Sequence, residues 1–543
     1  VLKVGDVIVG ANGKLFADKM DPRPELGYAL AVSQSPELKG VITFHVVRGK
    51  QLVSVDADLG CTDYYGPNWP FEGGKSDLLR KQALDVVVNN QGDRLNFWTP
   101  LFLMASGDEA AMEKARRMIY GMNPDEDKAE NVTGASSLST SYHLISACEY
   151  YLLTGDTAAM PGIKRMTRII EYNQFPSGGW SHGHGQGYGE ITNVGLASLM
   201  SLILARECGL KVDEAKIARS VRAFGAYCGT NFPYGMGTGG AGRSGRMDNG
   251  MNAMAAIIYH LLGEEEMSRR WARGVCYMWM AREHGHAEGM FSMAWGPLGA
   301  ALAPKEEFQT FLDEMMWHYE LGRGCDGGMM FLRKGRVDYP VNQTAAVGLF
   351  LWLPQHRLRI LGAEEGIFGS TPPAALEKAV LAFRDKKWDE MKAAVAASGM
   401  ANTKPAQQLL DAYAAIQRAA DFAVKAAEQN IKAFKPATAA AQLEEASMLL
   451  GYEPDAVKAL KARLPDRPQD TRQPEKPLAA GDSKWTRGKT LPGNDGGFAC
   501  SPDYIAQTYA GAFTGMAPEQ IARFLAHFNG GPAAGAVLAK RLR

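Results

Sequence analysis

The stretch Gln174-Phe-Pro-Ser-Gly178-Gly-Trp180 lies where one apolar helical pattern ends and a glycine-rich loop begins. The loop continues as Ser181-His182-Gly-His184-Gly-Gln-Gly-Tyr188-Gly, and a second apolar pattern starts at Ile191. Glycine lets the backbone approach a ligand closely, and loops between helices display polar side chains. We therefore expect this junction to present two imidazoles and two aromatic rings at one end of a pair of helices.

On both sides of this junction, apolar helical patterns alternate with glycine-rich loops from about residue 75 to residue 362. The apolar member of a pair is followed by a short turn and then by an amphipathic helix bearing Arg and Lys. The turns are Gly107-Asp108, Gly155-Asp156 and Gly263-Glu264. The predicted helices cover residues 81–90, 97–106, 109–122, 138–153, 157–172, 192–208, 213–228, 247–262, 264–282, 291–302, 305–319 and 342–353.

This repetition, at a spacing of about 50 residues, predicts stacked helical hairpins in which helices rich in small apolar residues face inward. The stack can remain an open solenoid or close into a ring. The glycine-aromatic loops stand before the presumed inner helices, where a ring would gather them around one cavity, so they favour closure.

The motif Gln174-x-x-x-Gly178-x-Trp180 resembles the repeat motif of the squalene-cyclase and prenyltransferase type of α/α toroid. Asp326-Gly-Gly-Met-Met-Phe331 is similar to a degenerate second copy. The chemistry of those families is not implied, because their Asp-x-Asp-Asp cluster and their zinc-binding Asp, Cys and His set have no counterpart here. The whole arrangement is also similar to an uncharacterised bacterial family that joins a PDZ-like module to a toroid.

The first sixty residues carry that second resemblance. Alternation from Leu2 to an Asn12-Gly13 turn predicts a strand, residues 24–32 a helix, and residues 41–50 and 51–56 two strands joined at a glycine turn. These features resemble the second half of a PDZ domain. The carboxylate-binding loop and the peptide-pairing strand of that family would precede this core and are missing from the sequence, so we expect packing rather than peptide binding here.

Composition narrows the classes of partner. The chain has 59 basic and 59 acidic residues, which disfavours nucleic acid, and it contains no apolar run long enough for a membrane span. Its seven cysteines are scattered and form no Cys-x-x-Cys pair, so they predict buried thiols. The pattern at Val1 is already under way, so we expect upstream residues, an export signal among them, and favour a periplasmic or secreted location.

Four loops would meet at one mouth of a ring. They carry His182, His184, Tyr188 and Glu190 in the first, Arg243, Arg246, Asp248 and Asn249 in the second, His284, His286 and Glu288 in the third, and Asp326, Arg336, Asp338, Tyr339 and Asn342 in the fourth. Imidazoles one residue apart can share a divalent metal ion, so His182 with His184 or His284 with His286 could bind one, and His182 and His184 are the predicted ligands. Loop histidines more commonly hydrogen-bond to backbone.

Two kinds of catalysis fit these loops. Glu288 with Asp248 or Asp326 could act as the acid and base of a glycosidase, although Asp248 also has the position of a helix N-cap. Alternatively, His284 or His286 with Tyr339 could supply base and acid for β-elimination from a uronate, while Arg246 or Asn249 neutralises its carboxylate. Toroidal polysaccharide lyases resemble this inventory without matching it in order.

Aromatic side chains would complete a sugar-binding surface, although at least about half of such residues belong to ordinary cores. The residues predicted to bind substrate are Trp180, His182, Tyr188, Arg246, Asn249, Trp295 and Asp326. The glycine-rich run from Gly235 to Arg243 lacks the Lys-Ser/Thr ending of a phosphate-binding loop. The favoured function is a carbohydrate-active lyase or hydrolase. The alternatives are a non-enzymatic binding or scaffold protein, and terpenoid chemistry in an apolar cavity lined by methionines and Trp279.

The sequence thus predicts a mainly α protein in five parts. Residues 1–60 form the incomplete PDZ-like module, 75–362 the α/α toroid, 372–465 an Ala-rich region of three or four helices, 466–497 a linker, and 498–543 the C-terminal helices.

Overall fold

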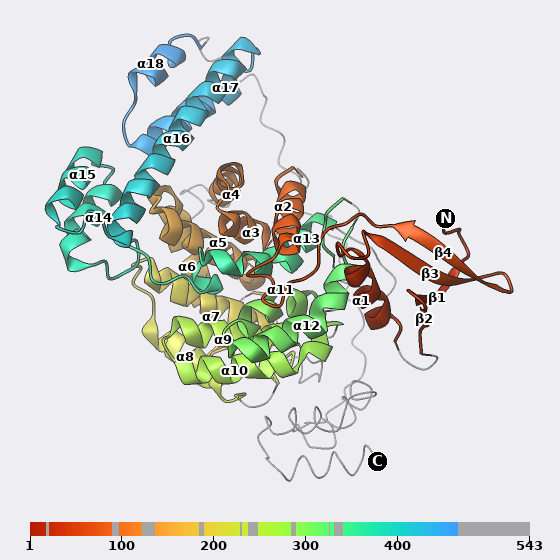
Figure 1. Cartoon of the computed structure of the whole chain (residues 1–543). Coiled ribbons are helices and arrows are strands. Elements are labelled where there is room, and N and C mark those ends of the chain that lie inside the picture. Colours follow the sequence, from red (N-terminus) through yellow and green to blue (C-terminus); the bar gives the residue numbers. More distant parts are fainter. Residues whose placement is uncertain are drawn as a thin grey trace, which may run out of the picture. The chain divides into compact units, whose positions relative to one another are not determined.

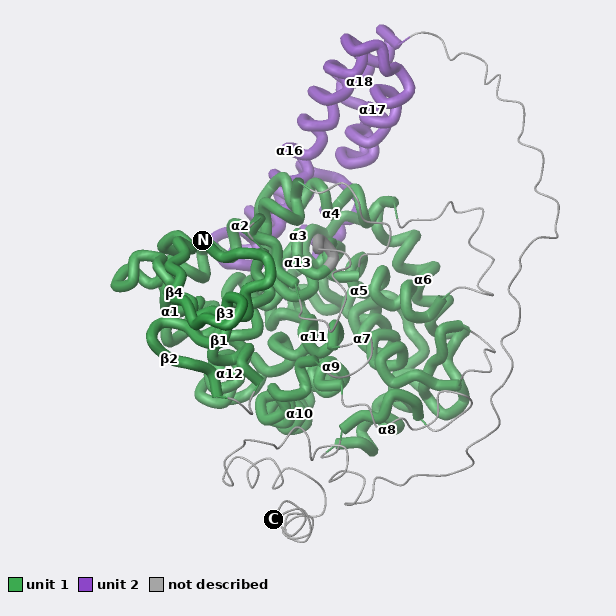
Figure 2. The backbone as a smooth tube through the Cα atoms, turned by 90° about the vertical axis from the view of Figure 1, so that its right-hand side faces the viewer, with its two compact units in different colours: residues 1–372, 500–543 green, residues 373–499 purple. Residues whose placement is uncertain are grey.

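The computed structural model describes residues 1–17, 21–89, 97–121, 136–183, 189–228, 231–236, 248–283, 289–324, 326–330 and 340–464. Most of them are helical (Figure 1). The chain divides into two compact units, one spanning Val1–Pro372 and the other beginning at Pro373 (Figure 2). The fold is therefore mainly α, as predicted, with one small β-sheet near the N-terminus.

The N-terminal module consists of one helix and a four-stranded antiparallel sheet in the order β2-β1-β3-β4. Its elements are β1 (Val7–Ala11), β2 (Lys14–Leu15), α1 (Arg23–Ser33), β3 (Val41–Arg48) and β4 (Gln51–Asp58). Asn12 and Gly13 both have positive φ, 50° and 82°, as the tight turn between β1 and β2 requires. The helix, the turn and the β3–β4 hairpin predicted from the sequence are confirmed.

A closed ring of six helices forms the centre of the first unit as far as its residues are described. In ring order they are α3 (Thr99–Ser106), α5 (Ser137–Thr154), α7 (Thr192–Glu207), α9 (Asn249–Leu261), α11 (Met290–Ala300) and α13 (Pro340–Gly348). Each packs against the next, and α13 packs against α3. The ring is closed, so the open solenoid is wrong and the α/α toroid is confirmed.

Each inner helix has an outer partner. In the same order the partners are α4 (Glu109–Gly121), α6 (Met160–Asn173), α8 (Glu214–Gly225), α10 (Glu265–Tyr277), α12 (Lys305–Leu321) and α2 (Gly74–Asn89). The last pair joins the first helix of the toroid to the last, because α2 packs against α13. The chain thus closes the ring by pairing segments about 260 residues apart.

The prediction that inner helices are buried and outer helices are amphipathic is confirmed. Nearly every residue of α7 is buried, whereas α8 buries only Ile217, Ser220 and Phe224. The predicted turns end inner helices with glycine in the left-handed region, at φ 70° for Gly107 and 68° for Gly155. Glycine adopts this conformation without steric cost, so the chain reverses sharply there.

Several predicted boundaries differ from the structure. The first helix begins at Gly74 rather than at residue 81, and the helix predicted over 264–282 ends at Tyr277, after which Trp279–Glu283 form a separate 3-10 helix, η4. The helix predicted over 342–353 is divided between α13 and the 3-10 helix η6 (Leu349–Gln355). Pro354 lacks the backbone N–H that would continue the helical hydrogen bonds, so the helix ends soon after this residue.

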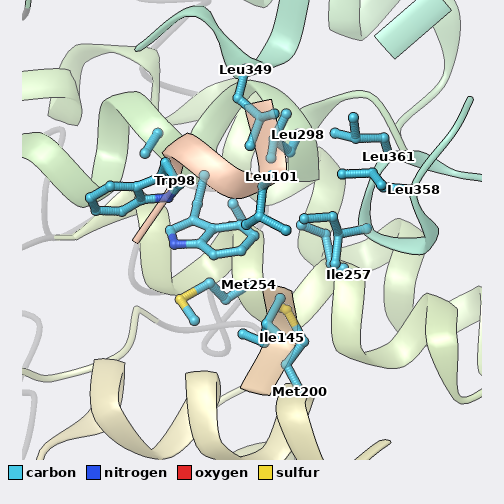
Figure 3. Packing of buried hydrophobic residues seen from close by; sticks show 14 of the residues in the cluster. Trp98, Leu101, Ile145, Met200, Met254, Ile257, Leu298, Leu349, Leu358 and Leu361 are labelled. Atoms are coloured by element: carbon cyan, nitrogen blue, oxygen red, sulfur yellow. The ribbon is translucent and has the colours of Figure 1, made fainter. Parts of the chain in front are cut away.

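The interior of the ring is filled by apolar side chains. Figure 3 shows Leu101, Ile145, Met200, Met254 and further buried residues meeting there from different inner helices. At the end of the ring where the inner helices stop, η6 and η7 (Arg359–Leu361) pack against them. The ring is therefore a packed core and not a pore.

A buried polar cluster fixes the N-terminal module to the toroid. The Glu320 carboxylate on α12 accepts hydrogen bonds from Gln34 Nε2 at 2.5 Å, Tyr65 OH at 2.7 Å and Arg323 Nη1 at 2.7 Å. Lys75 Nζ on α2 lies 3.1 Å from the same carboxylate. Gln34 follows α1, so the cluster joins the module to two outer helices of the ring.

A second contact joins α1 to the ring through η4. Arg23 on α1 donates from Nη1 and Nη2 to Glu283, at 2.6 and 2.9 Å. The guanidinium of Arg282 lies over the Trp317 ring of α12, 4.4 Å from its centre. The module and the toroid therefore belong to one compact unit.

The second compact unit is helical throughout its described part. It contains η8 (Ala374–Leu376), α14 (Glu377–Arg384), α15 (Trp388–Ala397), α16 (Lys404–Lys432), α17 (Pro436–Leu450) and α18 (Asp455–Lys461). The sequence predicted three or four helices here. The structure has five α-helices in residues 374–464, because a turn at Lys386, with φ 58°, separates α14 from α15.

Candidate functional site

The beginnings of neighbouring inner helices contact one another at one end of the ring. Ser137 N, in the first turn of α5, donates to the carbonyl of His182 at 2.6 Å, and Thr192 N at the start of α7 donates to Tyr234 O at 2.9 Å. Asn249 N at the start of α9 donates to Ser292 Oγ of α11 at 3.1 Å. Among the described residues, hydrogen bonds thus join neighbouring segments pairwise at the beginnings of α5, α7 and α9, and a common mouth for all four loops stays a prediction.

A cluster of five aromatic rings closes the lumen beneath this mouth, and we call it the aromatic floor. Its members are Phe97, Trp98, Tyr142, Phe291 and Trp295. Trp295 Nε1 donates to Tyr142 OH at 2.9 Å, joining α11 to α5 on the opposite side of the ring. Phe97 stacks on Tyr142, with ring centres 4.4 Å apart, and remains partly exposed.

Trp180 and Trp295 were both predicted to stack against a sugar, and the structure places both in the core. Trp180 is 0% exposed, and its Nε1 donates to the carbonyl of Ile170 at 2.7 Å. This bond ties the glycine-rich loop to the end of α6. Trp295 is also fully buried, within the aromatic floor. In this conformation neither indole presents a face to a ligand.

Asp248 and Asn249 hold the start of α9. Asp248 is 1% exposed, and its Oδ1 accepts from Gly250 N at 3.1 Å and from Ser292 Oγ at 3.3 Å. This is an N-cap, so the capping interpretation is confirmed. Asn249 Nδ2 donates to the carbonyls of Val275 and Met278, which directs this side chain toward the outer helix α10.

The first loop is also braced by its own polar groups. Glu190 is buried and accepts hydrogen bonds from Ser177 Oγ and, at 3.1 Å, from Gly179 N. His182 is half-buried, and burial lowers the pKa of its imidazole. Burial therefore favours the neutral imidazole, which is the form that binds metal ions.

Asp326 lies in the degenerate second copy of the motif and is exposed. Its Oδ1 accepts from Gly328 N at 2.9 Å, and Thr344 Oγ1 of α13 accepts from Met329 N at 3.0 Å. The turn is thus held against the last inner helix, with the carboxylate of Asp326 accessible to solvent.

The remaining predicted site residues fall outside the described part of the structure. They are His184, Tyr188, Arg246, His284, His286, Glu288 and Tyr339. Within the described residues, no three His, Cys, Asp or Glu side chains are grouped so that they could hold a metal ion. The metal site therefore stays a prediction.

Asn193, in the first turn of α7, is a polar residue that the sequence analysis did not single out. It is 1% exposed, and among the described residues neither its Oδ1 nor its Nδ2 has a hydrogen-bond partner. Ser181 Oγ and Thr192 Oγ1 are also buried without a hydrogen-bond partner among the described residues. The sequence did offer a signal for Asn193, because Thr192 and Asn193 form a polar pair at the start of an otherwise apolar helix.

A closed ring of helical hairpins with loop-borne polar groups at one mouth defines an α/α toroid. The family described as "Domain of unknown function (DUF6288)" matches residues 76–362, which are the helices of this ring. The chain belongs to this family. Within the described residues, each helix is too short or too polar to span a lipid bilayer.

Among solved structures, the chain is similar to the GH76A α-1,6-mannanase from Salegentibacter sp. HEL1_6. The match has a TM-score of 0.39 and 12% identity, and it covers 52% of this chain and 98% of that chain. At this level the likeness carries no conclusion about activity. The comparison with curated proteins finds no match. The PDZ resemblance is supported by none of these comparisons and stays a prediction.

Proposed function

We propose that the chain is a carbohydrate-active enzyme, a glycoside hydrolase or a polysaccharide lyase, that works at the mouth of the toroid. The observation that carries this proposal is the aromatic floor with polar groups beside it. Phe97 is partly exposed on top of the floor, and Glu190, Asp248 and His182 lie at the beginnings of the neighbouring inner helices. Sugars bind to such surfaces by stacking on an aromatic ring while polar groups accept hydrogen bonds from their hydroxyl groups.

The catalytic groups proposed are those of the third and fourth loops. For hydrolysis, Glu288 would act as the acid or base with Asp326, whose carboxylate is exposed and reachable by a ligand. For elimination, His284 or His286 would remove the C5 proton of a uronate while Tyr339 protonates the leaving oxygen. Asp248 would have a positioning role, because its carboxylate caps α9.

The test combines binding with product analysis. A ligand that binds the native state raises the melting temperature, so we would screen neutral and anionic glycans by thermal shift. We expect a glycan-specific shift and, on prolonged incubation, either new reducing ends or the absorbance of an unsaturated uronate. His284→Ala and Glu288→Ala should abolish product formation, and the exposed Asp85→Asn on α2 is the control. No shift with any glycan would refute the proposal.

A non-enzymatic binding protein is the second candidate, and one observation favours it. The two buried carboxyl groups at the mouth, Asp248 and Glu190, both accept hydrogen bonds from backbone N–H groups of their own loops. A glycan shift without any product would support this candidate. Terpenoid chemistry has less support, because the interior methionines Met200 and Met254 are packed in the filled core (Figure 3).

A further inference from the structure

The amide of Asn193 faces the lumen of the ring. Asn193 and Met200 are seven residues apart on α7, which puts them on the same face of the helix. Figure 3 shows Met200 in the interior of the ring. Gly195 lies on the opposite face, where an added Cβ would meet the Phe224 ring of α8 at 2.6 Å. The side chain of Asn193 is therefore directed inward and away from the outer helix.

The height of Asn193 in the ring places it at the mouth. It is the second residue of α7, whereas Tyr142 and Trp295 are the sixth residues of α5 and α11. Four residues of helix correspond to about 6 Å of rise, so Asn193 lies roughly one turn above the cross-ring hydrogen bond of the aromatic floor. It stands between the floor and the beginnings of the inner helices.

Leaving this amide unpaired is costly. A buried donor or acceptor without a partner costs about 1–3 kcal/mol, and Asn193 has one of each. Ser181 and Thr192 bring two more buried hydroxyls without partners among the described residues. They lie close by, because Ile191 N donates to Trp180 O at 2.7 Å and so joins the two segments. Four polar atoms without partners among the described residues thus belong to residues 181, 192 and 193, whose backbones adjoin.

We propose that Asn193 binds a pair of neighbouring hydroxyl groups of a neutral sugar, with Ser181 and Thr192 completing the subsite. An amide offers one donor side and one acceptor side, which matches two adjacent hydroxyls that each donate and accept. The carboxyl groups of Asp248 and Glu190 at the same end disfavour an anionic sugar. This inference rests on the proposed function and narrows it to glycans without carboxylates.

The test measures the melting temperature of the full chain without ligand and with neutral oligosaccharides or oligouronates. We compare wild type with Asn193→Leu, which is nearly the same size and has no polar atoms. Without ligand, Asn193→Leu should melt at or above the wild-type temperature, because buried unpaired atoms are removed. Its affinity for the neutral glycan should fall at least about tenfold, which corresponds to the loss of about 1.4 kcal/mol.

Asn252→Leu is the matched control. Asn252 is also a buried asparagine in the first turn of an inner helix, and its Oδ1 likewise has no partner among the described residues, but its Nδ2 donates to Asn231 Oδ1 at 2.9 Å. This variant should melt below wild type and keep its glycan affinity. The contrast separates loss of a subsite from general damage to the ring.

Each other result would overturn the inference. If Asn193→Leu melts below wild type or does not fold, the amide has partners in the ligand-free state, such as ordered water. If wild type binds a neutral glycan and Asn193→Leu binds it equally well, the subsite is wrong while the proposed function stands. A shift with oligouronates alone would overturn the neutral ligand, and no shift of wild type with any glycan would refute both proposals.

Discussion

Replacing Glu320 by Gln removes one negative charge from the cluster that fixes the N-terminal module to the toroid. In the native protein Lys75 Nζ is fully buried and lies 3.1 Å from this carboxylate. Burial lowers the pKa of Lys75, and Glu320 acts against that shift. Burial would raise the pKa of Glu320, but Arg323 and Lys75 together with hydrogen bonds from Tyr65 and Gln34 outweigh it and hold this pKa below its usual range.

The magnitude follows from the fate of Lys75 in the variant. Removing one partner of a buried ion pair costs about 3–5 kcal/mol. Lys75 can limit this cost by losing its proton, which from an unfolded-state pKa of about 10.4 costs about 4.6 kcal/mol at pH 7. If Lys75 is neutral in the folded variant, the cost of removing its proton falls by about 1.4 kcal/mol for each unit by which the pH rises. We therefore expect Glu320→Gln to lower the free energy of unfolding by about 3–5 kcal/mol at pH 7 and by clearly less at pH 9.

The assay is urea unfolding of the full chain, followed by tryptophan fluorescence at pH 7 and pH 9. Glu320→Gln combined with Lys75→Met should recover most of the lost stability and lose the pH dependence, because the fully buried cation is gone while Arg323 keeps its hydrogen bond to Gln34 Oε1 at 2.9 Å. Asp85→Asn is the control: its ion pair with Lys81 is exposed, at 56% and 73%, and should contribute less than about 1 kcal/mol. A single variant within 1 kcal/mol of wild type, or one that Lys75→Met does not rescue, would refute this reasoning.

Three further predictions concern the ring. Burial raises the pKa of Glu149 on α5 to about 7. The contribution of this group to stability is therefore fully present below its unfolded-state pKa of about 4.3 and is lost as the pH rises through about 7. The melting temperature should fall over this range, and a Glu149→Gln variant that keeps the same pH dependence would contradict this. Gly250→Ala should destabilise the ring by about 2 kcal/mol or more, since its Cβ would lie 2.3 Å from Phe291 O, whereas Gly274→Ala, with nothing within 4 Å, should be neutral or stabilising in the same denaturation experiment. Tyr142→Phe should cost about 1–3 kcal/mol by leaving Trp295 Nε1 without its acceptor, and adding Trp295→Phe should cost less than the sum of the single changes, the opposite result being strict additivity.

The helices of the toroid could be predicted because their signals are local. Gly107 and Gly155 end inner helices, and the apolar faces of α5 and α7 follow the helical period. Closure of the ring depends on α2 meeting α13, a contact between segments far apart in the sequence, which periodicity cannot reveal. The same holds for the cluster at Glu320, whose partner Gln34 is 286 residues away.

The candidate site was less accessible to sequence reasoning, because a buried tryptophan and a ligand-binding tryptophan look alike. Trp180 ends a glycine motif that suggests a binding loop, yet its indole hydrogen-bonds to Ile170. Asp248 showed both an N-cap pattern and the chemistry of an acid, and only the cap is visible in the structure. Asn193 escaped notice because the absence of partners is a property of the folded chain.

The packed interior of the ring, crossed by the hydrogen bond from Trp295 to Tyr142, leaves no channel from one end of the toroid to the other among the described residues. A polymer cannot be threaded through such a ring, so any long ligand must enter and leave by the same opening. A glycan held there would present either one chain terminus or a stretch lying across the rim.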